Sequence, residues 1–343
     1  MTRIYLDAMG GDHAPLSNIE GALEALSQDD SISVILAGNE NAIKTVLTEK
    51  NPAASIMERI TIENCSDVIS NHDAPVLAVR QKKDSAQVKG MLKIRNGEAD
   101  GFVSAGSTGA LLAGGMFRLG RIDGVERPAI ATLLPNGKGY FCLIDSGANA
   151  DCRPEYLPQF GIMGSVYMNA VRDIEKPRVG IANIGSEAEK GNSLVKEAYP
   201  LMESAPFSFV GNVEGRDITA DAADVIVCDG FTGNMLLKFM EGVAGTLMGI
   251  IKEEIGKNLR GKISYLIAKK NFRCVKKRMD YSEVGGAPLL GVNGAVVKAH
   301  GSSNAHAIAC AIKQCKIMHE GQVVQKIRDG ISRLTENDNK SEE

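Results

Sequence analysis

Short apolar runs alternate with longer amphipathic segments along most of this chain. Runs rich in Ile, Val, Leu and Ala that stop at Gly, Pro, Asp or Asn are typical of buried strands. This pattern predicts strands at residues 4–6, 33–37, 60–63, 101–103, 129–134, 140–144, 178–183, 207–211 and 225–228. It predicts helices between them, at residues 15–27, 39–48, 75–82, 85–96, 108–119, 154–168, 192–199 and 233–255.

Alternation of strands and helices at this spacing predicts an α/β fold with right-handed crossovers around a mostly parallel sheet. Residues 129–134 and 140–144 flank Pro135-Asn136-Gly137-Lys138-Gly139, which predicts a hairpin and therefore a mixed sheet. The expected architecture is a three-layer, Rossmann-like α/β/α sandwich that forms one domain over residues 1–335.

Residues 235–280 differ from the rest in character. Phe239, Val243, Leu247, Ile251 and Ile255 recur every four residues and form one apolar stripe on a helix. A second helix is expected after residue 261, and the segment from residue 257 to 279 holds nine Lys or Arg and no Asp or Glu. We therefore expect a protruding helical pair inserted in the domain. The polar end of the chain, residues 336–343, is expected to be disordered.

Polar, glycine-containing turns follow several of the predicted strands, at residues 7–13, 104–109, 145–149 and 229–234. In parallel sheets, ligands bind beyond the carboxyl ends of the strands. A turn that leads from a strand into a helix also presents backbone N–H groups at the positive end of the helix. The sequence therefore predicts one polar crevice that binds an anion.

The first turn holds Asp7, Gly10, Gly11, Asp12 and His13. N-capping of the next helix by Asp12 explains this turn about as well as substrate contact does. Gly106-Ser107-Thr108-Gly109 matches neither a Walker P-loop nor the dinucleotide-binding fingerprint. A tight strand–helix turn and a small-anion cradle remain equally good interpretations of it.

Basic and amide side chains in later turns are candidate partners of that anion. Lys190 lies in a glycine-flanked loop after residues 178–183, and Arg216 follows Asn212 and Glu214. The segment from Lys298 to Asn304 contains His300 and follows a further predicted strand at residues 295–297, with a helix expected after it. Each of these side chains is about as consistent with a solvated surface as with a site.

Composition narrows the function classes. The 343 residues carry a net charge of −3, with 5% aromatic residues and no Trp, which disfavours nucleic acid as a partner. The seven cysteines have no CxxC spacing, and no zinc-ligand pattern occurs, so neither a disulfide framework nor a metal site is expected. No signal peptide is evident at the start of the sequence.

Taken together, these turns resemble the phosphate acyltransferase (PlsX) family of bacterial phospholipid synthesis. The resemblance extends over nearly the whole chain, and its motifs are specific as a set although each is weak alone. The matching segments are residues 7–15, 104–113, 145–149, 211–218, 229–238, 285–294 and 298–303. Ser107 stands where the family often has Asn.

The resemblance implies transfer of a fatty acyl group from acyl carrier protein to inorganic phosphate, without a nucleotide, metal or other cofactor. A membrane glycerol-3-phosphate acyltransferase would use the acyl phosphate. The family fold resembles phosphotransacetylases and decarboxylating dehydrogenases. The resemblance also implies a homodimer that is cytoplasmic and peripherally associated with the membrane.

Residue roles follow as hypotheses from direct attack of phosphate on the thioester. Lys190, His13, His300, Asn212 and Asn234 are the catalytic candidates. His13 or His300 would move a proton, Lys190 with Arg216 would balance phosphate charge, and Asn149, Asn212 or Asn234 would donate to the oxyanion. The expected binding residues are Asp7, Gly10, Gly11, Asp12, Gly106, Ser107, Thr108, Gly109, Asn149, Glu214, Arg216, Asp229 and Thr232.

The helical pair has three candidate partners: the membrane, the acidic carrier protein and a second subunit. The apolar stripe over residues 239–255 favours dimer packing. The docking candidates are Leu259, Ile263, Leu266, Ile267, Lys269 and Lys270. For the whole chain, the alternatives are a phosphotransacetylase-type enzyme that uses acyl-CoA, a non-catalytic scaffold that binds carrier protein or membrane, and a dehydrogenase.

Overall fold

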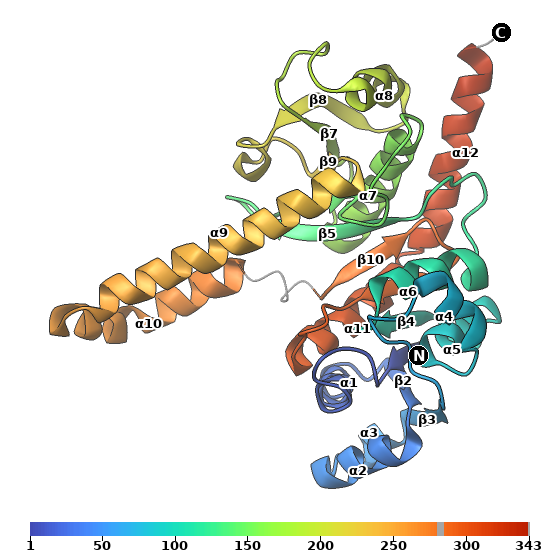
Figure 1. Cartoon of the computed structure of the whole chain (residues 1–343), viewed down its shortest axis with the longest axis vertical. Helices are drawn as coiled ribbons and strands as arrows, with labels where there is room; N and C mark the ends of the chain where they lie inside the picture. The colour runs from blue at the N-terminus through green and yellow to red at the C-terminus, as the bar shows by residue number, and fades with distance from the viewer. Residues whose placement is uncertain (280–284, 342–343) are drawn as a thin grey trace.

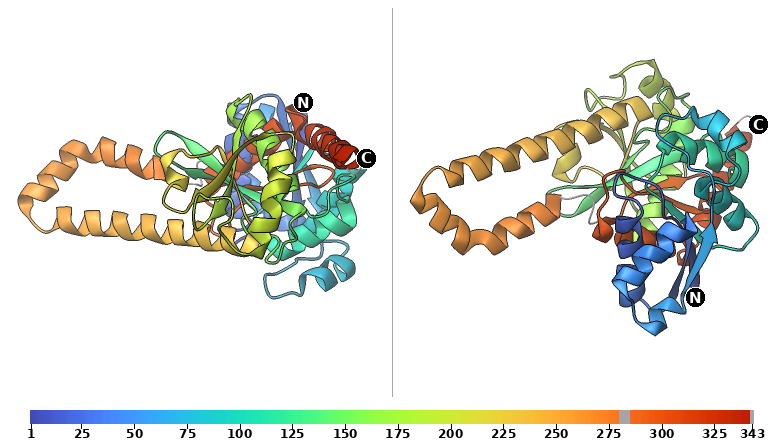
Figure 2. Two further views of the ribbon diagram at one scale, coloured as in Figure 1. Left: turned by 90° about the horizontal axis from the view of Figure 1, so that it is seen from above. Right: turned by 60° about the horizontal axis from the view of Figure 1, so that its bottom comes forward.

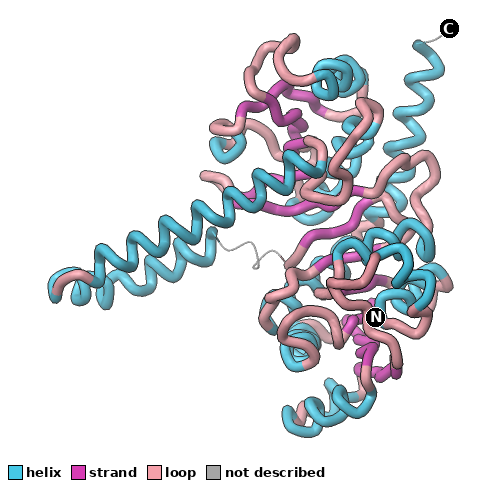
Figure 3. The backbone as a smooth tube through the Cα atoms, viewed as in Figure 1, coloured by secondary structure: helices cyan, strands magenta, loops and turns pink. Residues whose placement is uncertain are grey.

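The structure, a computed structural model, describes residues 1–279 and 285–341. A single large sheet lies between layers of helices, and two long helices project from it (Figures 1 and 3). The strands are β1 (Thr2–Asp7), β2 (Ile32–Gly38), β3 (Ile60–Asn64), β4 (Gly101–Ser104), β5 (Ala129–Pro135), β6 (Tyr140–Ile144), β7 (Arg178–Asn183), β8 (Ser208–Glu214), β9 (Val225–Val227), β10 (Ala287–Leu290) and β11 (Ala295–Lys298).

Each predicted helix overlaps an observed one. The helices are α1 (Leu16–Gln28), α2 (Glu40–Lys50), α3 (Ala54–Met57), α4 (Pro75–Gln81), α5 (Ala86–Arg95), α6 (Thr108–Gly114), α7 (Tyr156–Arg172), α8 (Ser193–Ser204), α9 (Gly230–Gly256), α10 (Leu259–Met279), α11 (Ala305–Glu320) and α12 (Val323–Ser341), with a π-turn η1 (Gly115–Leu119) and a 3₁₀ turn η2 (Ile218–Ala220). Of these, α3, α11 and α12 were not among the predicted ranges.

Two parallel blocks make up the sheet, whose strand order is β3-β2-β1-β4-β11-β10-β5-β6-β9-β7-β8. The first block runs from β3 to β11 and the second from β6 to β8. Between them, β10 pairs antiparallel with β11 and β5, and β5 pairs antiparallel with β6. The mixed sheet and the predicted hairpin are thus confirmed, whereas β10 was not predicted.

The carboxyl ends of the two blocks meet near the middle of the sheet, although the blocks run in opposite directions. Lys298, at the end of β11, pairs with Ala287 at the start of β10. Two residues further along β10, Leu289 pairs with Ile130 of β5. Ala131 then pairs with Ile144, the last residue of β6. This stagger brings the turns after β4, β11, β6 and β9 to one place.

Strand side chains are buried alternately on the two faces of the sheet, as expected where helices cover both. In β1, Ile4 and Leu6 pack with α1 and α11, whereas Tyr5 packs with Phe102 on the side of α5 and α6. Beneath the second block, α7 covers one face and the first turns of α9 cover the other. These layers confirm the three-layer α/β/α architecture.

Helices α9 and α10 form the helical hairpin, which extends away from the sheet (Figures 1 and 2). This hairpin begins at Gly230, earlier than the predicted insertion boundary, because Asp229 caps α9. Residue 280, the predicted end of the insertion, lies outside the described residues.

The chain end differs from the prediction. Residues 336–341 continue α12 as a helix, and 342–343 lie outside the described residues. The apolar stripe that leads into this segment, from Val323 through Ile327 and Ile331 to Leu334, is buried. No Gly or Pro follows Leu334 to end the helix.

Candidate active site

Buried polar contacts around Asp7 hold the loop after β1 in place. The Ser104 hydroxyl donates to Asp7 Oδ2 at 2.7 Å, and the Met9 N–H donates to Oδ1 at 3.1 Å. The Asn18 amide donates to three loop carbonyls at 2.8–3.3 Å. Burial raises the pKa of the Asp7 carboxyl. These contacts give Asp7 a positioning role in the loop, and its contact with substrate stays a prediction.

The turns after β1, β4 and β11 contact one another through small residues. A Cβ at Gly10 would lie 2.6 Å from the Gly106 backbone nitrogen, and Gly11 has a φ of 94° that favours glycine. The Asp12 N–H donates to the Gly301 carbonyl at 2.7 Å. Three of the predicted loops are therefore brought together.

The beginning of α6 lies at the same place. The Ser107 hydroxyl caps the helix by accepting from the Ala110 N–H at 3.5 Å, while Thr108 is exposed. Gly109 packs closely on Pro75. Ser107 is thus engaged in capping, and Thr108 presents its hydroxyl at the end of β4.

Lys298 is the most perturbed cation of this region. Its Nζ donates to the carbonyls of Ala105, at 3.5 Å, and Ala299. Among the described residues it has no carboxylate within ion-pair distance. Burial lowers its pKa to about 8, against the opposing effect of the Asp7 and Asp12 charges.

His300 lies two residues further on. Its Nδ1 accepts from the Ser302 N–H at 3.2 Å, so the neutral ring carries its proton on Nε2. Burial lowers the His300 pKa, and the nearby charges of Lys238 and Lys298 lower it further.

A cavity of about 260 Å³, here called the crevice, lies where these turns meet the second block. Thr108, Lys298 and His300 line it from the first block, and Asn234 and Lys238 line it from α9. Ser146 and Gly147 complete the wall after β6. Glu241 also lines the crevice and pairs with Lys238 at 2.8 Å. Two cations, one of them ion-paired, together with an imidazole, hydroxyl groups and an amide therefore surround a volume that fits a small anion.

The asparagine candidates differ in what their amides already do. Both Asn149 amide hydrogens are used, since Nδ2 donates to Asp145 at 2.9 Å and to Pro128 at 2.8 Å. Asn212 is buried and donates to the Glu187 carbonyl at 2.7 Å. The Asn234 side chain has no hydrogen-bond partner in the described part of the chain. Asn234 is therefore the best placed of the three to donate to a bound ligand.

Asp229 and Thr232 form the cap of α9. Asp229 accepts from the Thr232 N–H and hydroxyl, both at 2.8 Å. The carboxylate thus satisfies helix N–H groups, as capping residues do. Asp229 therefore serves the helix cap, and its contact with substrate stays a prediction.

Lys190 and Arg216 lie apart from the Gly106–Gly109 turn. They follow β7 and β8, and six strand spacings, roughly 30 Å of sheet, separate β7 from β4. Arg216 is 78% exposed and approaches the carboxylates of Glu214, at 3.5 Å, and Asp217, at 3.7 Å. The predicted single cradle of Gly106–Gly109, Lys190 and Arg216 is therefore not formed within one chain.

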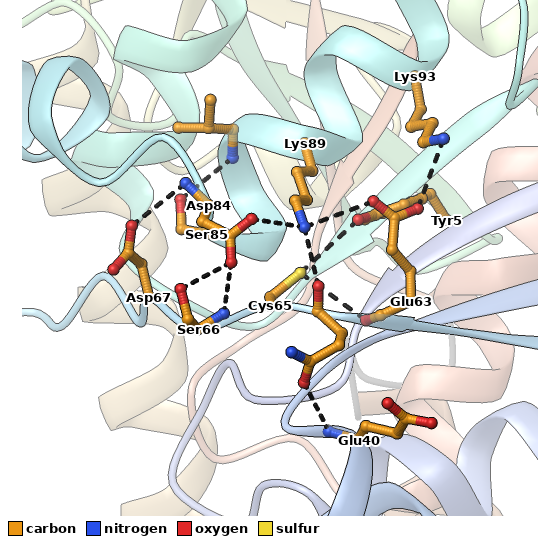
Figure 4. A network of polar contacts seen from close by, with 12 residues as sticks. Tyr5, Glu40, Glu63, Cys65, Ser66, Asp67, Asp84, Ser85, Lys89 and Lys93 are labelled. Carbon is orange, nitrogen blue, oxygen red and sulfur yellow. Dashed lines mark hydrogen bonds and ion pairs between the residues drawn. The ribbon is translucent and has the colours of Figure 1, made fainter.

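His13 is exposed on the loop after β1 and does not line the crevice. Elsewhere in the first block, Lys89 and Lys93 are paired with carboxylates. Lys89 contacts Asp84 at 2.6 Å and Glu63 at 3.8 Å, and Lys93 contacts Glu63 at 3.6 Å (Figure 4). This network fastens β3 to α5, whereas Lys298 has no carboxylate partner among the residues that the structure describes.

Sequence reasoning missed Lys298 and Lys238 as site residues. The available signal for Lys298 was a lone lysine at the end of an apolar run. No local sequence pattern indicates that Lys238 is a site residue, because its position depends on where α9 crosses the end of β6.

The predicted docking residues are all exposed near the tip of the helical hairpin. Leu259, Ile263, Leu266 and Ile267 are 50–82% exposed, and Lys269 and Lys270 are exposed as well. In the part of the chain that the structure describes, α9 is the one helix long and apolar enough to cross a bilayer, and its apolar window is unburied. The hairpin therefore offers a large apolar surface.

A family model described as "Fatty acid synthesis protein" matches residues 2–326. A phosphate acyltransferase from Alkaliphilus oremlandii is 49% identical over 97% of this chain and 98% of that protein. A phosphate acyltransferase from Clostridium botulinum is 45% identical over 97% and 99%. This chain belongs to the phosphate acyltransferase (PlsX) family. It is an acyltransferase, and the resemblance noted in the sequence is confirmed.

Solved structures support the fold. A phosphotransacetylase from Streptococcus pyogenes aligns with a TM-score of 0.61 at 18% identity over 94% of each chain. A branched-chain phosphotransacylase from Enterococcus faecalis aligns with a TM-score of 0.58 at 12% identity, over 93% of this chain and 99% of that one. At these identities the likeness concerns the fold alone.

Proposed function

We propose that this phosphate acyltransferase moves a fatty acyl group from acyl carrier protein to inorganic phosphate. The observation that carries the proposal is the crevice, where Lys298, Lys238 and His300 surround a space between the two blocks. Phosphate requires cationic and N–H or O–H donors, which these residues and Thr108 supply.

In the proposed reaction, a phosphate oxygen attacks the thioester carbonyl carbon. The C–S bond of the resulting tetrahedral oxyanion breaks, and the products are acyl phosphate and the carrier thiolate. Lys298 would hold phosphate, and the Asn234 amide would donate to the oxyanion. His300, which has its Nε2 protonated, would donate to phosphate or to the departing sulfur. A thiol with a pKa of about 8.5 leaves without strong acid assistance.

The helical hairpin supports the choice of carrier protein as donor and a peripheral membrane location. Its basic second helix would attract an acidic protein or an anionic lipid surface. We propose that the tip around Leu266 and Ile267 docks on the membrane, and that the stripe from Phe239 to Ile255 packs in a homodimer. The acyl phosphate would then be consumed by a membrane glycerol-3-phosphate acyltransferase.

Phosphate-dependent release of free thiol from an acyl-carrier thioester tests the proposal. Acyl-CoA as the preferred donor would identify a phosphotransacetylase-type enzyme instead. Thiol release that does not depend on phosphate, or none at all, would refute the proposed reaction.

A further inference from the structure

We propose that a second cavity, here called the apolar pocket, receives the fatty acyl chain and limits its length. This inference rests on the proposed function and adds the site where the enzyme binds the fatty acyl chain. The cavity has a volume of about 280 Å³ and lies under the carboxyl ends of β7 and β9. Its inner wall is formed by Leu157, Leu194, Val195, Ile218 and Leu236.

The composition of the pocket fits an alkyl chain. Leu157, Val195 and Ile218 are buried, and Leu194 and Leu236 are partly buried. The polar groups that also line the pocket are engaged locally. Asp229 and Thr232 bond each other, and Asn192 caps α8 through the Val195 N–H at 3.0 Å. The walls therefore leave mainly apolar surface for a ligand, which favours a hydrocarbon.

The first turns of α9 separate the apolar pocket from the crevice. Asp229, Thr232 and Leu236 face the pocket, whereas Asn234 and Lys238 face the crevice. A chain in the pocket would leave its thioester end at the pocket mouth, and the thioester would have to pass the first turns of α9 to reach Asn234 in the crevice. The mouth includes Gly191, which directly follows the exposed Lys190.

A larger cavity of about 590 Å³ is not close to the crevice, where the thioester would react. It is lined by Lys176 and Pro177 before β7, by Phe207 and Ser208 at the start of β8, and by α12. These are the amino ends of the strands, on the opposite edge of the sheet from the crevice. The apolar pocket is therefore the better candidate for the acyl chain, because it lies at the carboxyl ends of its strands.

The test varies chain length and pocket depth together. Leu194→Trp fills the pocket, and Leu194→Ala enlarges it. Each methylene group of the acyl chain that is kept out of an apolar site lowers the affinity about fourfold. We expect Leu194→Trp to lower kcat/KM for sixteen-carbon acyl-carrier thioester at least tenfold relative to an eight-carbon one. Leu194→Ala should shift the preference toward longer chains. Lys196→Trp, on an exposed position of the same helix, should keep the wild-type length profile.

Displacement of a fluorescent fatty acid provides a readout that needs no turnover. Wild type should bind the probe and Leu194→Trp should bind it at least tenfold more weakly. An unchanged length profile in both Leu194 variants, in an active enzyme, would overturn the pocket assignment and leave the proposed reaction intact. Absence of phosphate-dependent thiol release in wild type would overturn the reaction, and probe binding would then decide the pocket separately.

Discussion

The charge state of Lys298 should control how well the enzyme uses phosphate. With a pKa of about 8, its ammonium form declines from about one half at pH 8 to about one tenth at pH 9. Because kcat/KM reports the free enzyme, kcat/KM for phosphate should fall about fivefold over this interval. The sign follows from the lowered pKa, since the charge is present below pH 8 and lost above it.

Neighbouring groups should not produce this decline. The His300 pKa is lowered, so the ring is already neutral at pH 8. Inorganic phosphate is mainly the dianion across the interval. The ammonium of Lys298 is therefore the group expected to change.

Lys298→Gln removes the charge and keeps a donor of similar length. A charge-assisted hydrogen bond contributes about 1.5–3 kcal/mol, so kcat/KM for phosphate at pH 7 should drop about 10- to 150-fold. The decline between pH 8 and pH 9 should disappear. Lys238→Gln is the matched control, because Lys298 remains and the decline should persist.

The assay measures thiol release at several phosphate concentrations for each pH, in folded variants checked by circular dichroism. A pH decline that survives in Lys298→Gln would refute the assignment. So would an unchanged kcat/KM for phosphate at pH 7.

Three further predictions concern the second block, the loop after β1 and the helical hairpin. Lys190→Ala should leave the phosphate KM within twofold, because Lys190 does not line the crevice. Steady-state kinetics with phosphate varied would detect a raised phosphate KM, which would contradict this placement. Asn18→Ala should reduce the free energy of unfolding by about 1–3 kcal/mol, because three loop carbonyls lose their donor. An unchanged denaturation curve would show that the Asn18 hydrogen bonds do not stabilise the loop after β1. Leu266→Glu should abolish flotation with anionic liposomes and Ser264→Glu, the charge-matched control, should not; equal flotation of wild type and Leu266→Glu would eliminate the apolar tip as an anchor.

The sequence was sufficient for most strands and helices because their apolar periodicity is strong. Each predicted strand overlaps an observed one, and the hairpin at Pro135–Gly139 follows from its turn residues. β10 was missed because Ala287-Pro288-Leu289-Leu290 is short, follows two glycines and contains a proline. These features weaken a strand pattern, and pairing with β5 and β11 overrides them.

The site was predicted less completely, because proximity across a sheet depends on strand order. Nothing local indicates that six strand spacings separate the Lys190 loop from Gly106, or that α9 carries Lys238 to the crevice. Capping by Asp229 and anchoring by Asp7 also escaped prediction. A carboxylate that serves its own backbone and one that serves a ligand have the same sequence pattern.

The short antiparallel seam between the two blocks has a mechanical consequence. In the sheet, β10 and β5 are joined by only two registered pairs, Leu289 with Ile130 and Leu290 with Ala129. Because α7 also packs on α11 and α12, a rotation that changes the width of the crevice would have to slide these helices past one another. An anion that bridges Lys298 and Asn234 would draw the halves together, so occupancy itself would tighten the enzyme around its nucleophile.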